Sequence, residues 1–557
     1  MAKRNLPKSD QFIFSNGLAE AKAANSSASQ IPDSPELWIA ILFGQGGELQ
    51  AIEFCARLTK RGRFWIALIP IGAELNSRTL AGISQTLRKS GSQPAKNGLS
   101  LLSPQIVLLN PRKTNLVSKE KTLLVSQAQK TAGTASSVDR FLLSLAETFE
   151  NRAAAVLLSG KKLFALNGLR AIKAEGGLVF AQDQRRSQNQ NLTVSRTAGV
   201  IDFILAPERI IRNLIDAARH AALACVDGNS EDTVSQQDLD RIFAILRLLS
   251  GVDFTYYKQS TLRRRILRRM VLTKKETFKD YHQYLQVKPG EVDLLFHDLL
   301  INVTHFFRDP HVFQTLKKKV FPKIVRFNQR DEPTRIWIPA CSTGEEAYSI
   351  AIAFLEFLGK DSHNTSLQIF ATDISETALN KARAGVYPES IAAELTPQRL
   401  RRFFHKVEAG YQITKSIRDL CVFARQNVVE DPPFSRIDLI SCRNLLIYLG
   451  PVLQKKVIPI FNYSLKPNGY LLLGASETIA GFTEFFGLVE KQAKLYIRKQ
   501  SLLRPDIEFK AGLTLVNASP SIDINAGADE MFDLQVQVDR ILLSQYAPSG
   551  VIHKLTL

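Results

Sequence analysis

Two adjacent glutamates, Glu345 and Glu346, follow a turn of small residues, CSTG, at the start of a helix-like segment. The preceding run RIWIPA (335–340) is typical of a buried strand, and the turn lets a ligand approach the free N–H groups of the helix start. The next apolar run (367–373) ends in Asp373, where a carboxylate accepts hydrogen bonds from ribose hydroxyls. Acidic groups at the turn have the wrong sign for the pyrophosphate of NAD. They suit a cationic nucleoside such as S-adenosylmethionine.

Two more segments bring polar residues toward the same place. INVTHFFRDP (301–310) precedes the first of these strands, and SCRNLLIYL (441–449) overlaps the end of a third apolar run, IDLISC (437–442). Ligands of open α/β sheets bind at the carboxyl ends of the parallel strands. We therefore expect the four segments to form one site.

In this order and spacing, the motifs NVTHFFRD, ACSTGEEAYS, ATDIS and CRNLLIY resemble the CheR family of chemotaxis receptor methyltransferases. The resemblance covers roughly 238–498 and implies a protein-glutamate O-methyltransferase that uses S-adenosylmethionine. It implies Arg308 and Tyr448 as catalytic residues. By matching position it implies these cofactor-binding residues: Asn302, Thr304, Arg308, Glu345, Glu346, Asp373, Asn427, Val428, Cys442 and Arg443. Because a glutamate carboxylate is already ionised at neutral pH, the reaction needs no general base, and His305 is not expected to act as one.

The run STLRRRILRRMVLTKK predicts a basic helix. Leu262, Ile266 and Met270 recur at four-residue spacing and form an apolar stripe, so we expect the arginines to face outward. Arginines crowded within two turns repel one another, which favours an anionic partner. Nucleic acid is one candidate, and the family resemblance favours the acidic methylation helices of receptors. The predicted substrate-binding residues are Arg263, Arg264, Arg268 and Arg269.

Short apolar runs alternate with helical stretches from Leu37 to Ala222, which predicts a parallel sheet covered on both faces. WIAILFGQGGELQAI and LLSGKKLFALNGLRAIKAEGGLVFAQD resemble the beginning and end of a CheB-type methylesterase. That reaction needs a serine, a histidine and a carboxylate. Gly44 and Phe164 stand where the resemblance implies the serine and the acid, and His220 is the first histidine of the chain. We expect this half not to hydrolyse esters.

The whole chain is predicted to be an α/β multidomain protein. Its units are a disordered lead-in (1–33), a doubly wound CheB-like α/β domain (34–222), a linker (223–237), a small helical domain (238–290), a Rossmann-like methyltransferase domain (291–500) and a tail resembling a truncated lead-in to a sensor domain (501–557).

Composition narrows the class of protein. Hydrophobic residues make up 45% and charged residues 22%, with no secretory h-region or membrane-length apolar run. The five cysteines are scattered, which argues against a disulfide scaffold or a metal site. We expect a cytoplasmic enzyme without membrane insertion or metal, whose partners are receptor cytoplasmic helices.

Two alternatives stay open. A scaffold would bind receptors without turnover. A nucleic-acid methyltransferase would explain the net charge of +19, and DPPF (431–434) resembles the catalytic tetrad of such enzymes. This string precedes its strand, whereas the tetrad would follow it, so no nucleic-acid partner is expected.

Overall fold

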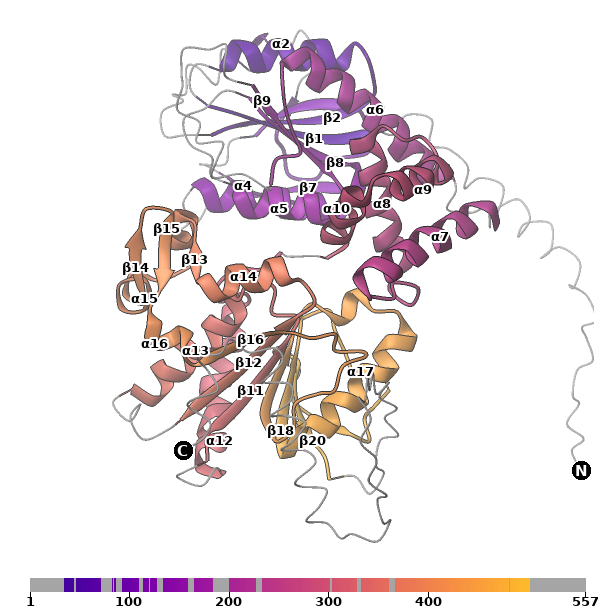
Figure 1. Cartoon of the computed structure of the whole chain (residues 1–557). Helices are drawn as coiled ribbons and strands as arrows, with labels where there is room; N and C mark the ends of the chain where they lie inside the picture. Colours follow the sequence, from indigo (N-terminus) through magenta and orange to yellow (C-terminus); the bar gives the residue numbers. More distant parts are fainter. Residues whose placement is uncertain are drawn as a thin grey trace, which may run out of the picture.

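The chain forms three units in sequence order, coloured from indigo to yellow in Figure 1. The computed structural model describes residues 35–500 except for 45–46, 72–82, 84, 87–92, 110–113, 120, 128–133, 159–164, 184–199, 227–232, 301–302, 328–331, 360–365 and 480. The predicted lead-in and tail, Phe164 and Asn302 lie outside the described residues. We name 35–226 the N-terminal domain, 233–299 the helical domain and 303–500 the C-terminal domain.

A parallel sheet forms the centre of the N-terminal domain, in the order β10-β9-β8-β1-β2-β5-β3. Its strands are β1 (Leu37–Phe43), β2 (Phe64–Pro70), β3 (Gln93–Pro94), β5 (Gln105–Leu108), β8 (Ala153–Leu157), β9 (Leu178–Gln182) and β10 (Phe203–Leu205). Every residue of β1 and β2 is buried, because helices cover both faces.

One face of this sheet packs against α2 (Glu48–Thr59) and α6 (Pro207–Val226). The other packs against α4 (Thr134–Phe149) and α5 (Leu166–Ala174). The doubly wound prediction is confirmed. The sequence did not predict the small antiparallel sheet of β4 (Leu99–Ser100), β6 (Thr114–Lys119) and β7 (Thr122–Gln127).

The helical domain consists of α7 (Thr233–Ser250), α8 (Gln259–Thr273), α9 (Phe278–Val287) and α10 (Pro289–Leu299). Leu262, Ile266 and Met270 of α8 are buried among these helices, as the stripe predicts. The boundary predicted at 290 falls too early, because α10 contributes buried residues to this same core. The predicted linker is also too long: α6 extends to Val226 and α7 begins at Thr233.

The C-terminal domain has a second sheet, in the order β16-β12-β11-β17-β18-β20-β19. Its parallel strands are β11 (Thr334–Pro339), β12 (Leu367–Asp373), β16 (Cys421–Arg425), β17 (Ile437–Cys442) and β18 (Leu465–Leu473). Two further strands, β19 (Phe486–Glu490) and β20 (Leu495–Arg498), form an antiparallel pair, and β20 lies inside the sheet between β18 and β19.

Helices also cover both faces of this sheet. α12 (Phe321–Phe327), α13 (Glu345–Leu358) and α14 (Glu376–Ala384) pack on one face, and α17 (Pro451–Ser464) packs on the other. The strand order turns at β11, with β12 on one side and β17 on the other, so the carboxyl ends of these strands flank a crevice.

A small antiparallel sheet projects from the C-terminal domain. It contains β13 (Val386–Tyr387), β14 (Phe404–Val407) and β15 (Gly410–Ile413), preceded by α15 (Pro397–Phe403). Figure 1 places it below α4 and α5 of the N-terminal domain, and Asn167 of α5 donates a hydrogen bond to Glu394 beside this sheet (3.0 Å).

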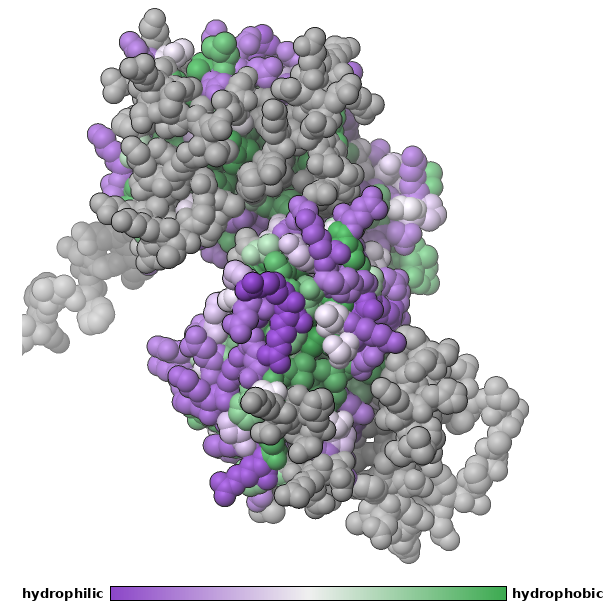
Figure 2. Space-filling model, turned by 90° about the vertical axis from the view of Figure 1, so that its left-hand side faces the viewer, coloured by the Kyte–Doolittle hydropathy of each residue, from purple (hydrophilic) through white to green (hydrophobic). Residues whose placement is uncertain are grey.

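The face of the C-terminal domain shown in Figure 2 is mainly hydrophilic, with a narrow apolar strip between the polar areas. Among the helices that the structure describes, none combines the length and apolar character needed to cross a bilayer.

Candidate active site

The turn between β11 and α13 depends on small residues. Ala340, Ser342 and Gly344 have φ values of 55°, 51° and 91°, in the left-handed region. A Cβ on Gly344 would lie 2.8 Å from the Cβ of Ala382, so this position has no room for a side chain. The chain therefore reverses tightly over the sheet and leaves the first N–H groups of α13 facing the crevice.

Asp373 ends β12 and fixes this turn. Its Oδ2 accepts a hydrogen bond from the Ser342 N–H (2.8 Å), and its Oδ1 accepts one from the Ser375 N–H (2.8 Å). Burial raises the pKa of Asp373, which these two bonds partly offset. Each carboxylate oxygen retains a second acceptor position, so Asp373 can also accept from ribose hydroxyls.

The two glutamates of α13 have different environments. Glu345 is buried and accepts a hydrogen bond from Thr343 Oγ1 (2.6 Å), and burial raises its pKa to about 7. Glu346 accepts from Ser441 Oγ at the end of β17 (2.5 Å) and lies 3.6 Å from the Arg443 guanidinium. Glu346 thus connects α13 to β17, while Glu345 faces a cavity.

The segment 303–309 is held against β17 by Arg443. The Arg443 side chain is 1% exposed and donates hydrogen bonds to the Arg308 carbonyl (2.9 Å) and to Asp309 (2.6 Å). Arg308 itself donates to the Val303 carbonyl (3.2 Å). The Arg443 side chain therefore positions the segment that carries Arg308, and Cys442 beside it is completely buried.

Tyr448 lies in the electrostatic environment of Arg308. Burial and the charge of Glu175 raise the pKa of Tyr448, whereas Arg265 and Arg308 lower it. The Tyr448 carbonyl accepts a hydrogen bond from the N–H of Lys258, just before α8 (2.9 Å). The charge of Arg308 therefore acts on Tyr448, although 140 positions separate the two residues in sequence (448 − 308).

His305 has an environment unsuited to a base. Burial and the nearby Arg308 lower its pKa to about 4, so the ring is neutral and weakly basic at neutral pH. This agrees with the expectation that the reaction proceeds without a histidine base.

The loop after β16 contains Asn427 and Val428. The Asn427 N–H donates to Asp431 (2.7 Å), and its side chain donates to Glu430 (2.9 Å), which closes the loop. Val428 packs on the apolar cluster around β17. Next to them, Gln426 Oε1 is buried with no hydrogen-bond partner among the described residues.

The tetrad-like string DPPF lies in the same loop, and its aromatic residue belongs to the core. Phe434 is 3% exposed and stacks on Phe370 with ring centroids 4.7 Å apart. A ring packed in this way is not available to stack on an extruded base. The structure therefore does not favour a nucleic-acid methyltransferase.

A cavity of about 960 Å³ lies over this edge of the sheet. Thr304 and Glu345 line it from the C-terminal domain, as do residues of the small sheet. Arg170 and Lys173 line it from α5 of the N-terminal domain. Sequence reasoning did not predict this contribution, because no local pattern shows which distant domain covers a site.

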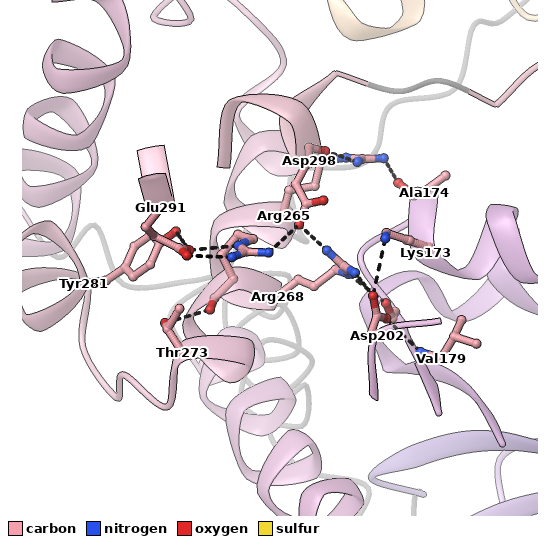
Figure 3. Close-up of polar contacts among 12 residues, drawn as sticks. Lys173, Ala174, Val179, Asp202, Arg265, Arg268, Thr273, Tyr281, Glu291 and Asp298 are labelled. Atoms are coloured by element: carbon pink, nitrogen blue, oxygen red, sulfur yellow. Dashed lines mark hydrogen bonds and ion pairs between the residues drawn. The ribbon is translucent and has the colours of Figure 1, made fainter. Parts of the chain in front are cut away.

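The prediction that the arginines of α8 face outward is wrong, because all five are buried or partly buried. Arg265 and Arg268 are 5% and 4% exposed. Arg268 forms ion pairs with Asp202 and Asp298, and Arg264 pairs with Glu150 and Glu175. Figure 3 shows Arg268 between Asp202 and Asp298. Facing away from the helical core does not expose these residues, because the N-terminal domain covers this side of α8.

The other two basic residues have local partners. Arg269 forms two hydrogen bonds with Glu291 of α10 (2.9 and 2.7 Å). The Arg263 guanidinium lies over the Phe278 ring, 5.3 Å from its centroid. In this arrangement the predicted substrate-binding arginines serve contacts within the chain.

Comparisons with known proteins agree with this geometry. The SAM-binding domain of CheR methyltransferases matches residues 302–495, and the all-alpha domain of the same family matches 237–300. The CheB methylesterase family matches 40–214.

Relatives match along much of their length. The chemotaxis protein methyltransferase of Borreliella burgdorferi is 30% identical over 260 residues, which are 45% of this chain and 92% of that protein. The chain belongs to the CheR family of S-adenosylmethionine-dependent protein-glutamate methyltransferases. The chemotaxis protein methyltransferase Cher2 of Pseudomonas putida is 31% identical over 260 residues, 45% of this chain and 94% of that protein.

A longer match includes the N-terminal domain. An uncharacterized 104.1 kDa protein of Rhodobacter capsulatus is 34% identical over 406 residues, which are 69% of this chain. The match spans 43% of that relative's length. The family assignment confirms the predicted three-part fold and the S-adenosylmethionine-binding domain.

The residues at the crevice suit this cofactor. Gly344 provides close access to the backbone, and the nearby Glu345 and Glu346 carboxyls can attract a cation. Gln426 Oε1, which has no hydrogen-bond partner within the part of the chain that the structure describes, provides a buried acceptor beside the loop expected to contact adenine. An amino group could donate to this oxygen.

Proposed function

We propose that the C-terminal domain transfers methyl groups to glutamate side chains of chemotaxis-type receptors. The observation that carries this proposal is the grouping of Arg308, Tyr448 and the two glutamates of α13 at one edge of a sheet that ends in Asp373. The family assignment supports the same substrate class.

In this proposal Asp373 and Glu345 hold the cofactor, together with the loop at Asn427 and Val428. Asn302 and Thr304 complete the contact from the segment before β11. Glu346 acts through its bonds to Ser441 and Arg443, which keep α13 and β17 in register. S-adenosylmethionine supplies an electrophilic methyl group on a sulfonium.

Arg308 and Tyr448 have the task of orienting the substrate. The guanidinium of Arg308 binds one oxygen of the glutamate carboxylate and leaves the other free to react. Tyr448 remains protonated at neutral pH, because its pKa is raised, and so it can donate a hydrogen bond. These residues bring two reactants together and exclude water, and neither has to accept a proton.

We also propose that the N-terminal domain has lost esterase activity. The chain has Gly44 at the position of the serine, and its first histidine is His220 on α6. No histidine precedes His220, so none is present earlier in the domain to take the proton of a serine nucleophile.

The function is tested by incubating the full chain with methyl-labelled S-adenosylmethionine and a receptor cytoplasmic fragment. Carboxyl methyl esters release volatile labelled methanol in base, and a fragment with its glutamates changed to alanine should release none. Label that is stable to base, or that appears equally on the altered fragment, would refute glutamate methylation. A protein that binds S-adenosylmethionine but never labels the fragment would support the scaffold alternative.

A further inference from the structure

The N-terminal domain contacts α8 through one edge of its sheet. Glu150 precedes β8, Glu175 precedes β9, and Asp202 precedes β10. All three carboxylates pair with arginines of α8. This is the amino-terminal edge of the sheet, opposite the carboxyl end of β1 where Gly44 replaces the serine. The contact is therefore separate from the former esterase centre.

The centre of this contact is desolvated and well bonded. The Arg268 and Asp202 side chains are each 2% exposed, and Arg268 Nε also donates to the Gly177 carbonyl (3.2 Å). Asp202 Oδ2 is anchored by the Val179 N–H (2.9 Å). Arg265 donates to the Ala174 carbonyl, as Figure 3 shows. Buried charge pairs of this kind specify one arrangement of two surfaces.

The same domain also reaches the reaction site. Arg170 and Lys173 line the cavity beside Thr304 and Glu345. The charge of Glu175 acts on Tyr448, and the charge of Glu147 on α4 interacts with Arg308. Two carboxylates of the N-terminal domain thus lie in the electrostatic environment of the groups that should orient a substrate carboxylate.

We propose that the N-terminal domain is an intramolecular competitor of the receptor, which occupies the arginine face of α8 and covers the cavity until an acidic receptor helix displaces it. This proposal rests on the proposed function and adds its regulation. An acidic helix would offer α8 the same groups that Glu150, Glu175 and Asp202 offer now, so the two partners exclude each other. Methyl transfer requires the domain to move away.

A reversible lock tests the proposal in the full chain. A Cβ added at Gly176 would lie 3.2 Å from the Cβ of Arg264, below the roughly 3.5–4.5 Å of a disulfide, so the bond requires a small backbone shift at Gly176, where φ is +89°. The double variant Gly176→Cys/Arg264→Cys, oxidised and confirmed by mass spectrometry, should bind the receptor fragment at least tenfold more weakly than its reduced form. Calorimetry should show equal affinity for S-adenosylmethionine in both forms. The reduced form is the matched control, since it has the same substitutions.

A second set of variants opens the contact. Asp202→Asn, Glu150→Gln and Glu175→Gln together remove the charges that hold α8, and an asparagine can still accept the Val179 bond. We expect receptor methylation to rise at least threefold with unchanged cofactor affinity. The control removes three exposed carboxylates elsewhere on the same domain, as Glu53→Gln, Glu208→Gln and Asp216→Asn, and should leave the rate unchanged.

If the oxidised and reduced forms of the double variant bind the fragment with equal affinity, the N-terminal domain does not compete with the receptor. A methylation rate that stays the same or falls when the folded triple variant is used leads to the same conclusion. If oxidation of the double variant weakens binding of the fragment but the protein never transfers methyl groups, the proposed function is contradicted and the proposed competition is supported. A fragment that binds no form at all contradicts both proposals.

Discussion

The N-terminal and C-terminal domains are built alike and differ at the ends of their strands. Both have a parallel sheet with helices on two faces and a buried core. In the C-terminal domain, β12 ends in Asp373 and β17 leads into Arg443. In the N-terminal domain, β1 leads into Gly44 and β8 into Leu158. The two cores are therefore alike while the residues at the carboxyl ends of the strands differ, because stability and chemistry depend on different residues.

The N-terminal domain has charged side chains at the amino-terminal edge of its sheet. Glu150, Glu175 and Asp202 lie at the opposite edge and pair with α8. Our proposal is that one domain transfers methyl groups and that the surface of the other serves binding. The predictions that follow test each side of this contrast, beginning with the largest effect.

Replacing Arg308 should separate catalysis from binding in the C-terminal domain. We expect Arg308→Ala to lower turnover by about 10²–10³-fold, because one fixed donor to the substrate carboxylate is lost. The affinity for S-adenosylmethionine should change much less. Initial rates with labelled cofactor and calorimetric binding give the two quantities, and Arg308→Lys should recover part of the rate. Equal losses in both would show that Arg308 serves the cofactor instead.

Asp373→Asn should weaken cofactor binding by about 10–100-fold, because a charged acceptor is replaced by a neutral one. The asparagine can keep only one of the backbone bonds to Ser342 and Ser375 through its oxygen. Calorimetry measures the affinity, and circular dichroism establishes that the variant is folded. Unchanged affinity in a folded variant would remove Asp373 from the site.

Cofactor affinity should depend on pH through Glu345. Its pKa is raised to about 7 in the free protein, and a cationic ligand binds the ionised form better. Affinity should therefore be full above pH 8 and fall as pH drops through 7, by about tenfold between pH 8 and pH 6 if one proton is coupled. Calorimetric titration across this range provides the measurement. Glu345→Gln should flatten the profile, and a dependence that survives this change must come from another group.

The smallest effect is expected in an esterase assay of the N-terminal domain, in which the protein should not change the rate of ester hydrolysis. A receptor fragment carrying labelled methyl esters should lose methanol at the same rate with and without the protein, because Gly44 provides no nucleophile and no histidine precedes His220. A His-containing CheB-type esterase serves as the positive control. Methanol release that depends on the protein would show that the N-terminal domain still hydrolyses esters.

Much of the fold follows from periodicity. The runs at 335–340, 367–373 and 437–442 are mainly apolar, as expected for strands covered on both faces, and the structure has them as strands within a residue. The spacing of Leu262, Ile266 and Met270 placed the core side of α8 correctly. These signals are local, so one sequence suffices to see them.

Other features depend on contacts between distant segments. The arginines of α8 were assigned to solvent because the sequence shows which side of a helix is apolar but not which domain covers its polar side. The short strands β13, β14 and β15 are too brief for a clear alternating pattern. Arg170 and Lys173 reach the cavity from 130 or more residues away in sequence, counted to Thr304 (304 − 173 = 131).

Arg268, which pairs with residues of two domains, also affects the cooperativity of thermal unfolding. Arg268 lies in the helical domain and is bonded to Asp202 of the N-terminal domain, in a contact that excludes water. Unfolding of the N-terminal domain alone would break the Arg268–Asp202 pair, with only Asp298 left as a partner of Arg268. The N-terminal and helical domains should therefore unfold in one calorimetric transition, although each has a core of its own. With Asp202→Asn the transition should broaden or split, since the domains would no longer share their cooperativity.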